Sequence, residues 1–97
     1  MDPTRHNLLR RARAFALSIV RLYATLPRHV ETQVIGKQLL RSGTSVGAHL
    51  HEAHRSRSDA EMISKIEVGL QELEETRYWV LLLVEAGLTP TTLADPI

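Results

Sequence analysis

The fold is decided by residues 58–86, whose sequence is SDAEMISKIEVGLQELEETRYWVLLLVEA. Ser58, followed three residues later by Glu61, forms the pattern of a capping box, which starts a helix. Gly87 suits the left-handed position that follows a helix, and Pro90 prevents the helix from continuing. The stretch therefore predicts one helix of about 43 Å, at a rise of roughly 1.5 Å per residue.

The apolar residues of this predicted helix recur at helical spacing. The stripe that we expect to face the core consists of Met62, Ile66, Gly69, Leu70, Leu73, Val80, Leu81 and Val84. The opposite side is polar in its first half, but its second half carries Trp79, Leu82, Leu83 and Ala86. A helix that is apolar all round is covered on both sides. We therefore predict that these four residues, with Glu72 and Glu75 beside them, form an interface with a second subunit.

Length and composition restrict the class of protein. A chain of 97 residues has room for one hydrophobic core, so we expect a single domain over residues 1–97. The longest apolar run, residues 78–84, is too short to span a membrane, and no secretory leader is recognisable. The absence of cysteine fits a reducing cytoplasm. Aromatic residues are few and strand-like alternation is missing, which predicts an all-α protein in the cytoplasm without membrane contact.

Two further helices are predicted before the long one. Residues 5–25 carry an apolar stripe at helical spacing, and Pro27 ends that helix. Residues 29–55 carry a second stripe, and a short turn then leads to the helix at 58–86. Because each connection is short, the three helices should form an up-down antiparallel bundle, followed by a short tail at 87–97.

The run RSGTSVGA, residues 41–48, has poor helix propensity. A phosphate-binding loop is one interpretation, but the Gly-Lys-Ser/Thr ending of such loops is missing and no strand precedes the run. Small residues on a helix also let a second backbone approach closely. We therefore predict that the segment stays helical, with Gly43 and Gly47 facing a neighbouring helix.

Charge is distributed unevenly along the chain. Residues 1–57 hold ten Lys/Arg and three Asp/Glu residues, whereas residues 58–97 hold two and eight. No acidic residue occurs between Pro3 and Val30. The carboxylates of the long helix either pair with arginines of the same bundle or face a neighbour or ligand. The basic residues that we consider candidates for nucleic-acid binding are Arg10, Arg11, Arg13, Arg21, Arg55 and Arg57.

A polar edge follows the second predicted helix, formed by Arg41, Ser45, His49 and Glu52. The last three suggest a hydrolase triad, but nothing nearby supplies the backbone donors of an oxyanion hole. We therefore expect a structural polar layer and no catalytic residue. His49, His51 and His54 do not share one helix face, so we predict neither a metal site nor a cofactor.

Three motifs in the sequence carry a resemblance to a known family. They are RSGTSVGAHLHEA at residues 41–53, Ser58-x-x-Glu61-Met62-x-x-Lys65, and Leu70-x-Glu72-x-x-Glu75-Thr76-x-Tyr78-Trp79. Together they resemble the bacterial four-helix bundle family encoded in intervening sequences of large-subunit ribosomal RNA genes. They are also similar to the accessory variability protein of diversity-generating retroelements. The resemblance covers roughly residues 8–88. His49 replaces a usual asparagine, and the fourth helix of the family is nearly absent.

The resemblance implies a homo-oligomer, typically a pentameric barrel, without enzymatic activity. Through the retroelement relative it also implies nucleic-acid binding. We therefore expect a non-enzymatic oligomeric helical module that contacts structured RNA or DNA, or an enzyme bound to nucleic acid. The alternative is a structural adaptor between proteins, in which the arginines serve subunit pairing. A hydrolase that uses Ser45, His49 and Glu52 is the least favoured interpretation.

Overall fold

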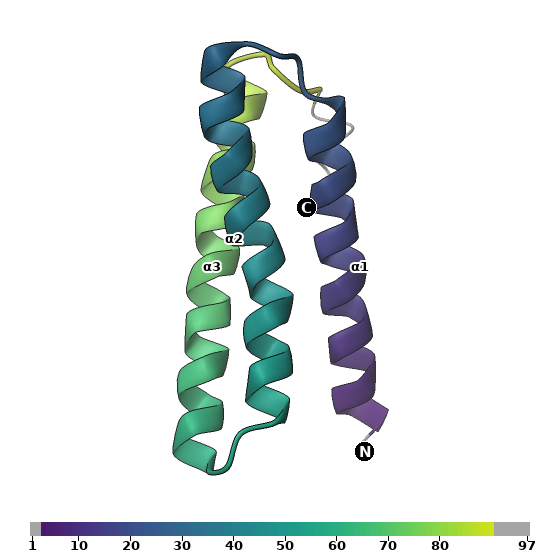
Figure 1. The fold of residues 1–97 in the computed structure, drawn as a ribbon, viewed down its shortest axis with the longest axis vertical. Helices are drawn as coiled ribbons and strands as arrows, with labels where there is room; N and C mark the ends of the chain where they lie inside the picture. Colours follow the sequence, from purple (N-terminus) through teal and green to yellow (C-terminus); the bar gives the residue numbers. More distant parts are fainter. Residues whose placement is uncertain (1–2, 91–97) are drawn as a thin grey trace.

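The computed structural model describes residues 3–90, which form three helices and no strand. These are α1 at Pro3–Thr25, α2 at Val30–His54 and α3 at Asp59–Glu85. Successive helices run in opposite directions, so α1 and α3 run the same way (Figure 1). The all-α prediction is confirmed, and every predicted helix boundary lies within two residues of the observed one. The predicted tail is described only as far as Pro90, and residues 91–97 lie outside the described part.

Both predicted end signals of α3 are confirmed. The Ser58 side chain accepts a hydrogen bond of 3.1 Å from the Glu61 backbone N–H, so Ser58 caps the N-terminus. At the C-terminus Gly87 adopts a φ of 72°. The N–H of Leu88 donates to the Leu83 carbonyl oxygen at 2.9 Å, and the N–H of Gly87 donates to the Val84 carbonyl oxygen at 3.0 Å. This pair of bonds is a Schellman motif, which ends the helix and turns Leu88 onto the core.

The core is a cluster of buried side chains from all three helices. Its members are Ile19, Leu22, Leu39 and Leu83, with the half-buried Phe15, Leu26, Ile35, Leu40, Trp79, Val80 and Leu88 packed against them. These residues come from the second half of α1, the first half of α2 and the second half of α3, together with Leu26 and Leu88 just after the ends of α1 and α3. The core therefore lies at the end of the bundle that contains the α1–α2 turn.

The predicted core stripe of α3 was wrong at two positions. Leu70 and Leu81 are 57% and 51% exposed, whereas Leu83, which we placed on the outer side, is fully buried. The reason is that α3 is apolar over a wide arc in its second half. Helical periodicity defines such an arc, but the direction of the neighbouring helices decides which part of it is buried. The observed inward line is Gly69, Thr76 and Leu83.

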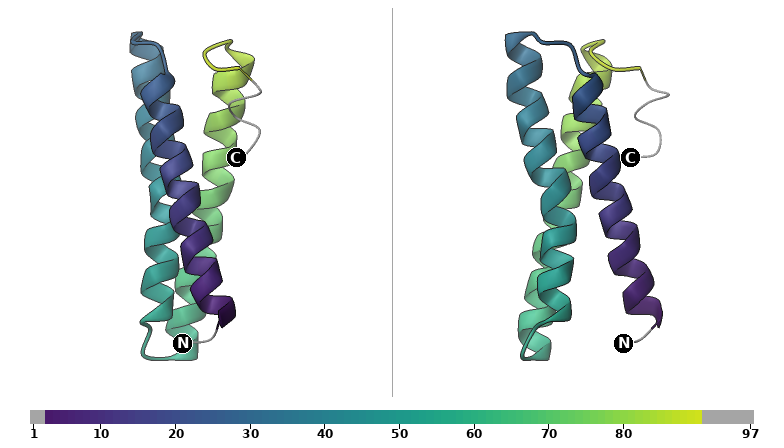
Figure 2. Two further views of the ribbon diagram at one scale, coloured as in Figure 1. Left: turned by 90° about the vertical axis from the view of Figure 1, so that its right-hand side faces the viewer. Right: turned by 45° about the vertical axis from the view of Figure 1, so that its right-hand side comes forward.

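The central helix is α2, which packs against both α1 and α3, whereas α1 and α3 make few direct contacts. Figure 2 shows α1 inclined across the α2–α3 pair. Residues 41–48 are helical throughout, as predicted. Gly43 lies against Ile19 of α1, and Gly47 lies against Ala12. Tertiary packing therefore keeps this segment helical despite its low propensity.

A buried pair of hydroxyl groups joins α2 to α3. Ser42 and Thr76 are both fully buried, and their side-chain oxygens lie 2.9 Å apart in a hydrogen bond. The Thr76 hydroxyl also lies 2.7 Å from the Glu72 carbonyl oxygen of its own helix. Buried polar groups are tolerated when they are paired in this way.

None of the three described helices is long and apolar enough to cross a membrane.

Candidate nucleic-acid interface

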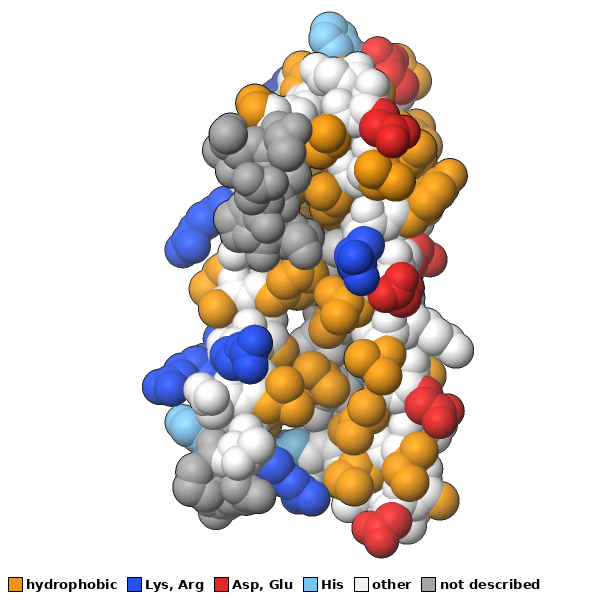
Figure 3. Space-filling view, turned by 180° about the vertical axis from the view of Figure 1, so that it is seen from behind, with side chains coloured by type: hydrophobic (Ala, Val, Ile, Leu, Met, Phe, Trp, Pro, Cys, Tyr) orange, Lys and Arg blue, Asp and Glu red, His pale blue; other side chains and the backbone are white. Residues whose placement is uncertain are grey.

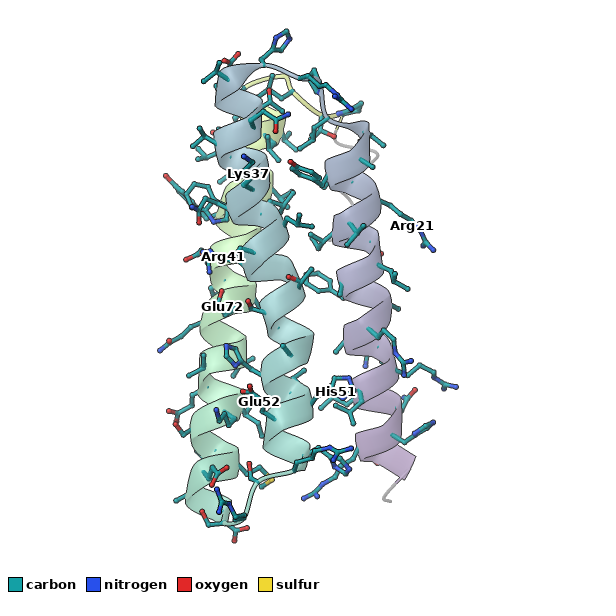
Figure 4. The ribbon with its side chains drawn as sticks, viewed as in Figure 1. Arg21, Lys37, Arg41, His51, Glu52 and Glu72 are labelled. Carbon is teal, nitrogen blue, oxygen red and sulfur yellow. The ribbon has the colours of Figure 1, made fainter. Side chains whose placement is uncertain are left out.

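One side of α1 carries three exposed arginines, Arg10, Arg13 and Arg21, which we call the α1 arginine face. The helix contains no acidic residue that could neutralise them. Arg10 donates a hydrogen bond of 3.2 Å to Asn7 Oδ1, which is a neutral partner. Arg21 points away from the bundle (Figure 4). Every ion pair in the described part of the chain lies on α2 and α3. The α1 arginine face therefore presents positive charge that no carboxylate of residues 3–90 offsets.

The other predicted basic residues lie elsewhere. Arg55 and Arg57 are exposed at the α2–α3 turn, at the end of the bundle where α1 begins (Figure 1). Arg11 is exposed but lines a groove between α1 and α3. The structure thus separates Arg11 from the α1 arginine face and leaves two basic surfaces, one along α1 and one at the turn.

The predicted polar layer joins α2 to α3 through ion pairs. The Arg41 guanidinium bonds Glu72 at 3.3 Å (Figure 4). It also bonds Glu75. Glu75 in turn accepts a hydrogen bond of 3.2 Å from the indole N–H of Trp79. The sequence left open whether the acidic residues of the long helix pair within the bundle or face a neighbour. Glu72 and Glu75 pair with an arginine of the same bundle.

Glu52 forms a second connection between α2 and α3. Its carboxylate accepts a hydrogen bond of 3.1 Å from the Lys65 ammonium group and lies 3.2 Å from His49 Nδ1. The hydrogen bond from Lys65, and then that from His49, lowers the pKa of Glu52 below its ordinary value. Sequence reasoning missed Lys65, although its position in the second family motif was a signal that it has a specific partner.

Ser45 does not join His49 and Glu52 in a triad. Its hydroxyl donates to the Arg41 carbonyl oxygen of the same helix at 2.7 Å. A nucleophilic serine needs its hydroxyl hydrogen-bonded to a base. The polar edge of α2 therefore has the geometry of a connection to α3, made by Arg41 with Glu72 and Glu75 and by Glu52 with Lys65.

The predicted subunit interface on α3 is largely occupied by contacts within the chain. Leu83 belongs to the core, and Trp79 packs against that core. Glu72 and Glu75 are held by Arg41. Leu82 is half-buried, and only Ala86 of the predicted set is exposed. The placement of Leu83 in an intersubunit contact was therefore wrong, because the turn of α3 that carries it faces α1 and α2.

An all-helical up-down arrangement with α2 at its centre defines a helical-bundle protein. The family model described as 23S rRNA-intervening sequence protein matches residues 5–96, and the chain belongs to this family. It is also similar to the crystal structure of a protein of unknown function from the S23 ribosomal protein family of Bacteroides thetaiotaomicron. The two chains share 36% sequence identity with a TM-score of 0.84, over 94% of this chain and 82% of that one. No curated protein matches the chain.

Proposed function

We propose that the protein is a non-enzymatic helical module that assembles with copies of itself in the cytoplasm and binds structured RNA. The α1 arginine face is the observation that carries the proposal. Its three guanidinium groups are exposed and no described carboxylate pairs with them, although α3 is rich in carboxylates. Arginine meets a phosphate with a planar pair of donors, so such a face suits a phosphate backbone.

The chemistry of this face favours recognition of shape over recognition of bases. Single-stranded bases are held by stacking on exposed aromatic rings. The α1 arginine face contains no aromatic residue, and its apolar neighbours are Leu17 and Val20, which are partly exposed. We therefore assign the face to the backbone of a folded RNA, with modest sequence specificity.

Assembly would multiply this weak contact. The resemblance to the intervening-sequence family implies five copies and a fourth helix in each bundle, and the resemblance to the accessory variability protein implies nucleic-acid binding. A ring of five copies would present the α1 arginine face five times to one RNA. Several weak contacts on one scaffold bind far more tightly than one.

The proposal is tested by reversing charge on the α1 arginine face. The variant Arg10→Glu with Arg13→Glu should lose binding to a folded RNA in a fluorescence anisotropy titration, while light scattering shows an unchanged molar mass. Arg77→Glu is the matched control, because Arg77 is exposed on α3. If the arginine variant binds RNA as the wild type does, the assignment of the face is wrong.

A second candidate function is that of an adaptor between proteins, and the groove between α1 and α3 favours it. The groove is mainly apolar and partly exposed. Contiguous exposed apolar surface on a soluble domain marks a protein interaction site. Under this proposal the arginines would serve subunit pairing, and the charge-reversed variant above would change the molar mass instead of the RNA affinity.

A further inference from the structure

A hollow with polar walls, which we call the turn pocket, lies at the turn between α1 and α2. Its volume is about 280 Å³, and the described residues that line it are Tyr23, Ala24, Leu26, Arg28, Thr32 and Gln33. Its lining sets it apart from the groove between α1 and α3, where hydrophobic side chains gather (Figure 3). The turn pocket therefore suits a polar ligand.

The wall on the α1 side is held in place by a close packing contact. A methyl group on Gly36 would meet Tyr23 Cε2 at 2.9 Å, so the Tyr23 ring lies directly against α2. In this position the Tyr23 hydroxyl donates a hydrogen bond of 3.3 Å to Gln33 Oε1. Because the amide oxygen of Gln33 is engaged in this way, the amide nitrogen is left as a donor for a ligand.

Thr32, in the wall formed by α2, carries a hydroxyl group without a partner. The residue is 1% exposed, and its Oγ1 is a buried atom that makes no hydrogen bond in the described part of the chain. The buried hydroxyls of Ser42 and Thr76, in contrast, bond each other. An unpaired buried hydroxyl is costly, so such groups are uncommon in proteins. A ligand with hydrogen-bonding oxygens in the turn pocket would supply the partner that Thr32 lacks.

The charges around the turn pocket favour an anion. Arg28 lines it and has no ion pair with the residues that the structure describes. Thr32 lies in the first turn of α2, where backbone N–H groups lack an acceptor within the helix and the His29 side chain provides no cap. Helix N-termini attract anions for this reason. Glu31, the acidic residue of this turn, is exposed and is not among the described lining residues.

We propose that the turn pocket binds a phosphate group, with the Arg28 guanidinium and the first N–H groups of α2 beside its charge, and with Thr32 and Gln33 donating to its oxygens. A phosphate group has acceptor oxygens that point in different directions, and a planar guanidinium meets two of them at once. The group belongs either to a small phosphate compound or to the 5′ end of an RNA. The inference goes beyond the proposed function, because neither self-association nor the α1 arginine face enters it.

The test is a titration of the full chain with inorganic phosphate, followed by backbone amide NMR. The amide signals of Thr32 and Gln33 should shift in a saturable way, and sodium chloride at the same ionic strength should not reproduce the shifts. Arg28→Gln should weaken the phosphate affinity by roughly tenfold or more, because it removes hydrogen bonds from a charged donor. Arg77→Gln is the matched control, since Arg77 is exposed on α3 and does not line the turn pocket.

The source of the phosphate group is identified with one folded RNA in a 5′-phosphorylated and a 5′-hydroxyl form. A higher affinity for the phosphorylated form that Arg28→Gln removes would assign the turn pocket to an RNA end. Equal affinities for the two forms, with the amide shifts in inorganic phosphate intact, would assign it to a small phosphate compound. Loss of RNA binding in the Arg10/Arg13 variant concerns the α1 arginine face alone and should leave these amide shifts unchanged.

A further variant, Thr32→Val, separates phosphate binding from folding. Valine has the shape of threonine without its hydroxyl, so in the absence of phosphate the variant should be as stable toward urea as the wild type, or more stable. Its affinity for phosphate should nevertheless fall by roughly threefold or more, because one donor is lost. Amide shifts that chloride reproduces would overturn the inference, as would Arg28→Gln and Thr32→Val chains that bind phosphate as the wild type does.

Discussion

Gly43 of α2 and Ile19 of α1 pack so closely that a methyl group on Gly43 would meet Ile19 Cγ1 at 2.7 Å. Ile19 is fully buried in the core and branched at Cβ, so it has little freedom to move aside. This contact sets how closely α1 approaches α2. It also explains a glycine in the middle of a long helix, where glycine is otherwise unfavourable.

Gly43→Ala should therefore destabilise the protein by about 1–3 kcal/mol, the usual effect of overpacking a core. Gly47→Ala is the matched control on the same helix, where the nearest atom to the new methyl group is the Ala12 carbonyl oxygen at 3.5 Å. That distance is an ordinary contact, so the control should keep or gain up to about 1 kcal/mol of stability. Urea unfolding followed by circular dichroism measures both. Equal effects of the two substitutions would show that α1 is not held against Gly43.

A second prediction compares Leu81 and Leu83, which the sequence pattern placed on opposite sides of α3. Leu83→Ala should cost about 2–5 kcal/mol of unfolding free energy, because it empties space in the core. Leu81→Ala, two residues earlier, should cost less than about 1 kcal/mol, since that side chain is half exposed. The same urea experiment applies. A larger loss at Leu81 than at Leu83 would mean that α3 is rotated relative to its place in this structure.

A third prediction concerns pH. The pKa of Glu52 is lowered in the folded protein by hydrogen bonds from Lys65 and His49. A carboxyl group with a lowered folded pKa adds stability above its unfolded pKa and loses it as the pH falls through its folded pKa. Glu52→Gln should therefore destabilise the protein at about pH 7, and the difference from wild type should shrink between about pH 5 and pH 2.

The control for this prediction is Glu85→Gln, because Glu85 is exposed and has no ion pair among the described residues. Thermal unfolding midpoints of the three proteins across that pH range supply the measurement. A difference between Glu52→Gln and wild type that stays constant with pH would exclude the ionised Lys65–Glu52 contact as a source of stability.

Much of the fold follows from local sequence signals. Ser58 and Gly87 act through their own neighbours along the chain, so both ends of α3 were predictable. The glycines of α2 were also interpreted correctly, because small residues in a helix imply close packing. The orientation of α3 was not predictable in the same way. Leu81 and Leu83 lie on opposite sides of a helix that is apolar all round at residues 78–84, and only the positions of α1 and α2 decide which of the two is buried.

The candidate site was predictable to a smaller extent. The α1 arginine face follows from helical spacing and from the lack of acidic residues in α1. The position of Arg11 at the groove between α1 and α3 could not be predicted, because it depends on how far α1 diverges from α3. The partners of Arg41 and Glu52 lie on another helix, 31 and 13 residues away, and no spacing rule within one helix reveals such pairs. The groove likewise exists only once three helices have been placed.

The most direct test of the proposed function is the salt dependence of RNA affinity. If the assembled protein binds a folded RNA through the α1 arginine face, log K should fall linearly with log salt, by roughly 0.7–0.9 for each phosphate contacted. Arg10→Gln with Arg13→Gln should then reduce both the affinity and the steepness of that slope, while Arg77→Gln leaves both unchanged. A slope that is the same in wild type and in the Arg10/Arg13 variant would contradict the account.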